Sequence, residues 1–302
     1  MSSTTTASTR AGCRCVAITI EGGRALVDFS GSAPQVEGSL NANYAITLSA
    51  VFYVFRALAR EPIPPNEGVL RRIRIRAPSG SVVNATFPAA VAGGNVETSQ
   101  RLVDVLLRAL ACAVPDRIPA ASAGTMNNVA VGGTDPRTGR SFSYYETIAG
   151  GAGAGPSGPG ASGVHTHMTN TMNTPIEALE AYYPFRITRY ALRVGSGGRG
   201  LYRGGEGLVR EMRFLAAADV TLLTERRRVA PYGLEGGAPG RRGKNVLMSA
   251  RGVRVLPAKL NFRVAAGETL RLETPGGGGW GSPTVRSRAA QKVARYRGLP
   301  RK

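Results

Sequence analysis

The two histidines of the chain, His165 and His167, lie two positions apart in the segment GVHTHMTNTMNTP. Random placement would bring two residues this close in roughly one case per hundred. On a strand, this spacing puts both imidazoles on one face, where they could hold a divalent metal or act as a ligand and an acid–base pair. Spacing alone favours the alternative of two polar loop residues that bond to the backbone. The neighbouring hydrogen-bonding side chains shift the balance towards a lined pocket; they are Thr166, Thr169, Asn170, Thr171 and Asn173.

Other polar segments have the same character. In GGNVETSQ, the amides of a helix N-terminus beside Glu97 and Thr98 could bind an anion, and ordinary helix capping explains these residues equally well. TMNN places Asn127 beside Asn128, and SYYETI places Glu146 in a strand with little apolar alternation. Polar groups in the centre of a strand cost stability unless they are paired, so these segments favour a functional pocket.

The remaining chemical motifs are weaker. GGGGWG at 276–281 lacks the Lys-Ser/Thr of a P-loop and follows no clear strand-to-helix transition, which argues against nucleotide binding. Cys13 and Cys15 form a CxC without a second pair, and Cys112 falls on an expected helix, which argues against a zinc site. The sequence also contains no GxSxG nucleophile motif.

The charge of the chain is strongly basic, with 39 Lys+Arg against 19 Asp+Glu and a formal net charge of +20. The two ends, 1–16 and 284–302, hold nine basic residues, which leaves 30 basic against 19 acidic residues elsewhere. Two arginine clusters stand out, at 71–76 and at 226–228. In the first, arginines alternate with Ile73 and Ile75, which predicts a strand with a solvated or subunit-facing arginine face. Nucleic-acid binding is disfavoured because the sequence shows no DNA-reading motif.

Hydrophobic periodicity and turn residues predict the elements of the first part of the chain. A hairpin is expected from CVAITI and RALVDFS, and a mostly buried helix over 41–60. A second helix is expected to begin with Asn95 as its N-cap, and a short third helix with Pro175 in its first turn. Further expectations are two strands around the DPRTG turn within 125–148 and a mobile glycine-rich loop over 150–163.

Beyond Tyr183 the pattern changes to eight short strands separated by glycine-rich turns. The strands are FRITRYALRV, GLYRGG, GLVREMRFLA, DVTLLTER, NVLMS, VRVLP, LNFRVA and TLRLETP. The fold class is therefore α+β, a mixed α/β half followed by a β-rich half of sandwich or barrel-like form, with a boundary near Tyr183. No apolar run approaches the ~20 residues that cross a membrane, and three cysteines favour a reducing cytoplasm.

These motifs resemble the C-terminal part of the hydantoinase B/oxoprolinase family, from about Val16 to Pro283. The segments that carry the resemblance are, in chain order, 27–56, 64–85, 88–111, ASAGTMNNVAVGG at 121–133, DPRTGRSFSYYETIAGG at 135–151, the stretch 163–214 that begins GVHTHMTNT, and ETPGGGGWGSP at 273–283. The resemblance divides the chain into an unmatched extension (1–15), an α+β part (16–183), a β-rich part (184–283) and a basic disordered tail (284–302).

The resemblance implies a subunit that acts with a hydantoinase A-type partner, which binds ATP. In such enzymes ATP activates the carbonyl of a cyclic amide, such as 5-oxoproline or a hydantoin, as a phosphorylated intermediate, and water opens the ring. Acetone and acetophenone carboxylases are similar, so a ketone carboxylase subunit is the alternative activity. A divalent metal is also implied.

Carried onto this sequence, the resemblance gives roles to the polar segments. The resemblance gives catalytic roles to His165, His167 and Glu146. The two histidines are also candidate metal ligands, and the other ligands of the metal are unknown. Substrate-binding roles fall to Asn95, Glu97, Thr98, Asn127, Asn128, Thr169 and Asn170.

One departure from the family pattern changes the expectation. The family carries a motif of the type NDPYxGGTHxxD, which resembles a source of metal ligands, before the point where this sequence begins. The chain is therefore expected to be a half-subunit that is inactive alone. The missing half is either encoded separately and associates with it, or the chain is a relic without activity; a non-catalytic assembly partner is the remaining alternative.

Overall fold

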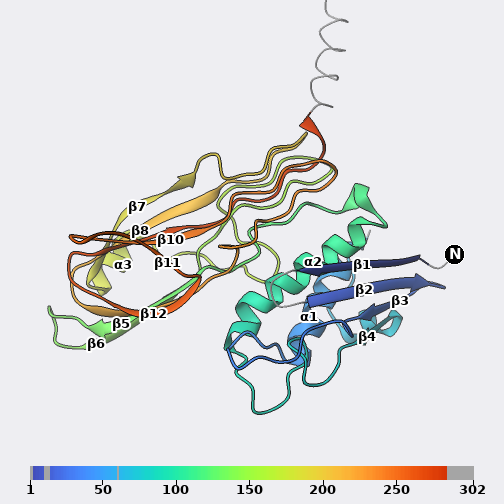
Figure 1. Ribbon diagram of the computed structural model, residues 1–302, viewed down its shortest axis with the longest axis horizontal. Coiled ribbons are helices and arrows are strands. Elements are labelled where there is room, and N and C mark those ends of the chain that lie inside the picture. Colours follow the sequence, from blue (N-terminus) through green and yellow to red (C-terminus); the bar gives the residue numbers. More distant parts are fainter. Residues whose placement is uncertain (1–2, 10–13, 60, 284–302) are drawn as a thin grey trace, which may run out of the picture.

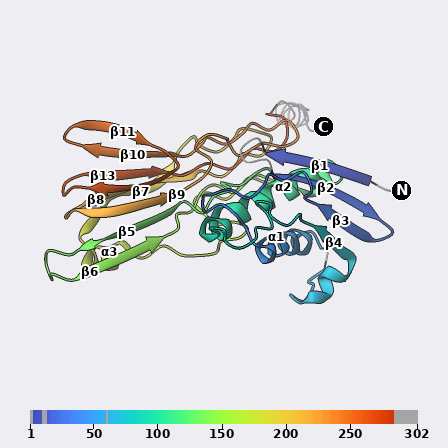
Figure 2. The same cartoon turned by 60° about the horizontal axis from the view of Figure 1, so that its bottom comes forward.

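The computed structural model describes residues 3–9, 14–59 and 61–283 of the chain, and the expected basic tail lies outside these residues. The described residues form an α+β fold with three sheets, as the sequence predicts. A four-stranded sheet with two helices lies at one end of the molecule and a β sandwich at the other (Figures 1 and 2). Within the described ranges, no helix combines the length and the apolarity that a membrane crossing requires.

The first sheet joins its strands in the order β1-β2-β3-β4. These are β1 (Ser3–Thr9), β2 (Arg14–Glu21), β3 (Arg24–Asp28) and β4 (Ile73–Arg76). β2 and β3 form the predicted hairpin, whose turn places Gly22 and Gly23 at φ of 55° and 70°, where glycine is not strained. β4 pairs parallel to β3, and its alternation is as predicted, because Ile73 and Ile75 face the core while the arginines are exposed.

Two helices, α1 (Tyr44–Ala57) and α2 (Ser99–Ala111), pack with this sheet around the first hydrophobic core. Two single turns complete this part, η1 (Glu67–Arg72) and η3 (Pro115–Arg117). A π-helical turn, η2 (Gly94–Thr98), precedes α2. The prediction of Asn95 as the N-cap is therefore wrong, since Gly93 holds that position and Asn95 is exposed within the turn. The π-helical turn begins with a glycine because any larger residue would clash there. A Cβ on Gly94 would lie 2.0 Å from the Asn41 carbonyl oxygen.

The second part is a sandwich of two sheets, in the strand orders β11-β10-β13-β8-β7 and β12-β9-β5-β6. Its strands are β5 (Asn128–Thr134), β6 (Ser141–Glu146), β7 (Phe185–Arg193), β8 (Gly207–Phe214), β9 (Ala218–Leu223), β10 (Lys244–Ser249), β11 (Gly252–Leu256), β12 (Lys259–Val264) and β13 (Thr269–Glu273). Seven of the eight strands expected beyond Tyr183 are present; the exception is GLYRGG at 200–205.

The sandwich draws strands from both sides of the boundary expected near Tyr183. β5 and β6 precede that residue, yet β5 pairs with β9, and both contribute to the second hydrophobic core. The predicted short helix, α3 (Ile176–Tyr182), buries Leu179 in the same core. The sheets therefore do not divide the chain at Tyr183.

Five extended glycine-rich segments, which we call the glycine bundle, run side by side beyond the sandwich (Figure 1). They are 119–124, 150–163, 195–206, 230–241 and 274–282. The last segment is central, because its backbone bonds to each of the other four. Gly278 N donates to Ala121 O (2.8 Å), Gly277 N to Gly205 O (2.9 Å) and Gly279 N to Ala238 O (2.9 Å), while Gly151 N donates to Pro275 O (3.0 Å). The prediction of a mobile loop over 150–163 is therefore wrong, because this segment is hydrogen-bonded within the bundle.

Side chains are excluded from the inside of the glycine bundle by the closeness of the backbones. A Cβ on Gly277 would lie 1.9 Å from the Ala152 oxygen, and one on Gly204 would lie 2.0 Å from the Gly277 oxygen. Neither contact could relax by turning a side chain, because both atoms belong to the backbone. The GLYRGG and GGGGWG segments are therefore neither a strand nor a phosphate-binding loop, but parts of this packing.

Replacing a central bundle glycine tests this account. We expect Gly277→Ala to lower the free energy of unfolding by about 3 kcal/mol or more, because the methyl group must push two backbones apart. Gly158→Ala is the matched control, since a Cβ there meets no atom within 4 Å. Urea denaturation of both variants measures the difference, and equal midpoints would contradict the packing described.

Candidate functional site

A buried carboxyl group, that of Glu97, lies in the turn η2 between the first core and the sandwich. Its Oε1 accepts hydrogen bonds from Thr125 Oγ1 (3.0 Å), the Met126 amide (3.3 Å) and Asn128 Nδ2 (2.9 Å). The hydroxyl of Tyr145, a residue that is 59% exposed, donates to Asn128 Oδ1 (2.5 Å). A continuous polar network therefore connects the buried acid with the surface.

Burial raises the pKa of Glu97 to about 8, and the nearby Glu225 charge acts in the same direction. The Thr125 hydroxyl and the charges of Arg227 and Lys259 oppose this shift without cancelling it. Glu97 is therefore largely protonated at neutral pH. A carboxyl group whose pKa lies near the working pH is suited to holding or moving a proton.

A second buried carboxylate, Asp104, lies further along α2. Its Oδ2 accepts from Arg101 Nη1 (3.1 Å) and from Arg226 Nη2, and all three side chains are buried. The Tyr232 hydroxyl donates to the Asp104 main-chain oxygen (2.8 Å), so the glycine bundle is bonded to the same turn of the helix. This pairing fixes α2 against the loop that follows β9.

A cavity of about 270 Å³ opens beside these two networks. Residues of loop 225–229, Ala258 and Lys259 line it together with residues of the first part of the chain. Its lining consists of Ala33, Val36, Leu40, Val82, Arg101, Glu225, Arg226, Arg227, Arg228, Val229, Ala258 and Lys259. We call it the arginine cavity. Small-molecule sites favour such positions between two packed parts of a chain.

The two histidines do not lie on a strand, the only arrangement in which their spacing would put both imidazoles on one face. His167 lies in a turn with φ of 60°, and its Nδ1 lies 3.1 Å from the Tyr53 hydroxyl on α1. His165 instead lies 3.5 Å from the hydroxyls of Thr169 and Thr171. Burial lowers the pKa of both imidazoles, which favours their neutral forms.

The side chains of the described residues do not by themselves complete a metal site. Residues 3–9, 14–59 and 61–283 contain no group of three His, Cys, Asp or Glu residues that could hold an ion. His165 and His167 also have separate hydrogen-bond partners, so no shared coordination follows from their nearness in sequence.

Glu146 forms a buried ion pair behind the histidine segment. Its Oε2 lies 2.9 Å from Arg210 Nη2, with the two side chains 4% and 1% exposed, and its Oε1 accepts from the Thr174 amide (3.1 Å). The Arg210 guanidinium lies 4.8 Å from the ring centre of Tyr190. The Glu146 carboxylate is thus engaged in holding the 165–174 segment against the sandwich, and it reaches His165 through its charge.

The predicted substrate-binding residues fall into three places. Asn128 contacts Glu97, and Asn127 beside it accepts from Arg227 Nη1 through Oδ1 (2.6 Å). Thr98 is buried and donates to the Leu40 oxygen (2.5 Å). Thr169 lies near His165, while Asn95 and Asn170 are exposed.

Sequence reasoning missed several residues of these networks. They are Tyr53, Arg101, Asp104, Thr125, Arg210 and Lys259. One signal was available, because Arg101 and Asp104 stand three positions apart in the mostly apolar helix RLVDVLLRALA, where such spacing predicts a contact.

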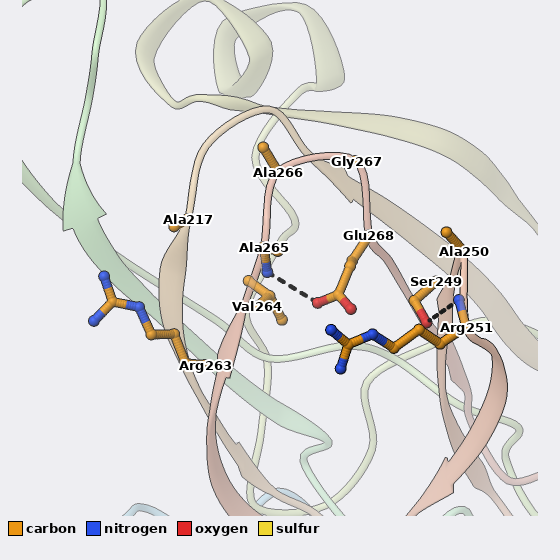
Figure 3. A pocket seen from close by; sticks show the side chains of 10 residues that line it. All are labelled: Ala217, Ser249, Ala250, Arg251, Arg263, Val264, Ala265, Ala266, Gly267 and Glu268. Carbon is orange, nitrogen blue, oxygen red and sulfur yellow. Dashed lines mark hydrogen bonds between the residues drawn. The ribbon is translucent and has the colours of Figure 1, made fainter.

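A larger hollow of about 550 Å³ lies at the far turns of the sandwich (Figure 3). Its polar groups serve their own turns, since Glu268 Oε2 accepts from the Ala265 amide (2.9 Å) and Ser249 Oγ from the Arg251 amide (3.2 Å). Most of the rest of its lining is small and apolar. The arginine cavity and its adjoining acids are therefore the better candidate site.

The sequence and the fold of the chain match a family of known proteins. The profile of the hydantoinase B/oxoprolinase family matches residues 5–283. The chain belongs to this family. The match begins within the segment 1–15 that the sequence alone left unmatched, and β1 pairs with β2 there.

Three similar proteins give this result its context. The 5-oxoprolinase 1 of Arabidopsis thaliana is 46% identical over 86% of this chain and 20% of its own. A putative D-/L-hydantoinase B-type subunit of Pseudomonas sp. strain NS671 is 32% identical over 90% of this chain and 47% of its own. The crystal structure of the ATP-dependent caprolactamase from Pseudomonas jessenii superposes with a TM-score of 0.83 at 25% identity, covering 99% of this chain and 55% of that one. The chain thus spans between a fifth and about half of these proteins.

The raised pKa of Glu97 predicts a pH dependence of stability. The folded state keeps a proton that the unfolded state loses between about pH 4.5 and 8, so this group's contribution to stability falls as pH rises through that window. The slope approaches about 1.4 kcal/mol per pH unit. We expect Glu97→Gln to remove this fall, since glutamine cannot ionise.

Urea denaturation at pH 5, 6, 7 and 8 measures this effect. The exposed Glu177 on α3 provides the matched control, and Glu177→Gln should keep the wild-type slope. Parallel stability curves for Glu97→Gln and the wild-type chain would contradict the assignment.

The Arg210–Glu146 pair predicts non-additive substitutions. Arg210→Met should cost about 3–5 kcal/mol, because it leaves a buried carboxylate without its partner. The double variant Arg210→Met with Glu146→Gln should recover much of this loss, since no buried charge remains. Denaturation of the two single variants and the double variant measures the coupling, and simple additivity would show that the pair is not coupled.

Proposed function

We propose that this chain is part of an ATP-dependent cyclic amidase that opens the ring of 5-oxoproline or a hydantoin. The observation that carries the proposal is the pairing of a buried acid, Glu97, with the arginine cavity beside it. Family membership supports the activity, as does the similarity to a 5-oxoprolinase, to a B-type hydantoinase subunit and to an ATP-dependent caprolactamase, as those proteins are named.

The chemistry of lactam opening fits these groups. Activation of an amide carbonyl with ATP, followed by attack of water, passes through anionic, phosphorylated species that fixed positive charge stabilises. A proton must also reach the ring nitrogen as its bond to the carbonyl carbon breaks. Arginines in a partly dry cavity supply the charge, and a protonated Glu97 adds no negative charge to offset it.

We propose that ATP binds to a partner subunit of the hydantoinase A type and not to this chain. The arginine cavity, at about 270 Å³, lies just below the roughly 300–1,000 Å³ of typical ligand pockets, which suits a small substrate better than a nucleotide. The name of the Pseudomonas hydantoinase relative, which marks it as the B-type member of a set, supports a second kind of subunit. Because the chain spans about half of that relative, we propose that the active complex also contains the remaining half.

Reconstitution tests this function. The chain should show no turnover alone, but should support formation of ADP and glutamate from 5-oxoproline when it is combined with an A-type subunit and the remaining half. Glu97→Gln and His165→Ala in the complex should each reduce kcat by about tenfold or more, whereas Glu177→Gln should have no effect. Turnover by the isolated chain would contradict the proposal.

The same assay separates the competing functions. Unchanged turnover in both Glu97→Gln and His165→Ala would assign the chain to assembly, because a structural partner needs neither group for chemistry. ATP consumption that depends on acetone and bicarbonate, and not on a cyclic amide, would assign it to ketone carboxylation.

A further inference from the structure

The arginine cavity contains more positive than negative charge. Five cations line it, namely Arg101, Arg226, Arg227, Arg228 and Lys259, together with one carboxylate, Glu225. Asp104 pairs with two of these cations from behind, and Glu225 pairs with Lys259. Two carboxylates therefore face five cations. Glu97, the other nearby acid, is held largely in its neutral form and therefore adds little negative charge to balance the cations.

Arg227 is the clearest example of this surplus of positive charge. Its guanidinium donates only to neutral oxygens, Asn127 Oδ1 (2.6 Å), the Glu225 main-chain oxygen (2.7 Å) and Asn245 Oδ1 (2.7 Å). Among the described residues no carboxylate forms an ion pair with it. Burial lowers its pKa to about 10, and the charges of Glu97 and Glu225 oppose this shift without cancelling it. These acceptors take four of the five guanidinium N–H groups, which leaves one N–H on Nη2 for a ligand.

The remaining wall of the cavity is apolar. Val36, Leu40 and Val82 come from the first part of the chain and line the cavity together with the cationic loop. The cavity, at about 270 Å³, is much larger than the space that a single water molecule needs. Such a space suits a small molecule with one anionic end and one hydrocarbon end.

We propose that the arginine cavity binds the oxyanion of a small ligand, either a carboxylate or a phosphate group, with the hydrocarbon part of the ligand against Val36, Leu40 and Val82. The proposal deepens the proposed function and rests on the same cavity, because it makes the preferred substrate a cyclic amide that carries an anionic group. Binding can be measured without turnover, so the two proposals can fail separately.

Calorimetric titration of the purified chain at low ionic strength tests the site with three probes. 5-Oxoproline carries a carboxylate, 2-pyrrolidinone is the same ring without it, and orthophosphate is the oxyanion alone. We expect 5-oxoproline or orthophosphate to bind at least tenfold more tightly than 2-pyrrolidinone. Binding of 5-oxoproline alone identifies a carboxylate site, and binding of orthophosphate alone identifies a phosphoryl site.

Variants that change the charge of the cavity predict the direction in which the affinity for the oxyanion changes. Arg228→Gln and Lys259→Gln should weaken binding of the oxyanion by about tenfold, while Glu225→Gln should strengthen it. Arg251→Gln is the matched control, because Arg251 is an exposed arginine at the far turns of the sandwich (Figure 3) and should leave affinity unchanged. Circular dichroism checks that each variant is folded.

Two results would overturn the inference. One is equal affinity for 5-oxoproline, 2-pyrrolidinone and orthophosphate, or no binding of any probe. The other is an equal effect of Arg251→Gln and Arg228→Gln on the affinity. This result would show that the binding comes from the overall positive charge of the chain and not from the arginine cavity.

Discussion

The close approach of glycine backbones is the constraint on which the rest of the structure depends. Segment 274–282 bonds to four other segments that lie far apart in the sequence, and no side chain can enter between them. The bundle also reaches α2, where Tyr232 bonds to the Asp104 backbone and a Cβ on Gly124 would lie 2.5 Å from Asp104 Oδ2. The relative position of the two cores, and of the cavity between them, therefore follows from this packing.

The second consequence is electrostatic. Once α2 is pressed against the loop after β9, the carboxylates of Asp104 and Glu97 and the guanidinium groups of Arg226 and Arg227 are removed from water together. Asp104 is neutralised by two arginines, whereas Glu97 receives only neutral donors and keeps its proton. The junction consequently holds surplus positive charge in a partly dry space, the condition under which an oxyanion is stabilised most strongly.

Much of the fold could be predicted from the sequence because its signals are local. The β2–β3 hairpin, the helix α1 and seven of the strands beyond Tyr183 follow from periodicity and turn residues within a few positions of one another. The polar segments around Glu97, Asn128 and His165 could also be selected, because polar groups in apolar surroundings need partners. Their partners could not be, since Thr125, Tyr53 and Arg210 are brought to them by folding.

The sequence by itself determined the family, the α+β class and the alternation that exposes the arginines of β4. Only the tertiary structure decided that His165 and His167 have separate partners, that 150–163 is packed rather than loose, and that the arginines at 226–228 line a cavity. The physical reason is that most of these roles depend on groups far away in the sequence. Tyr53 lies more than a hundred residues from His167, Asp104 from Arg226 and Ala152 from Gly277, so these contacts exist only in the folded chain.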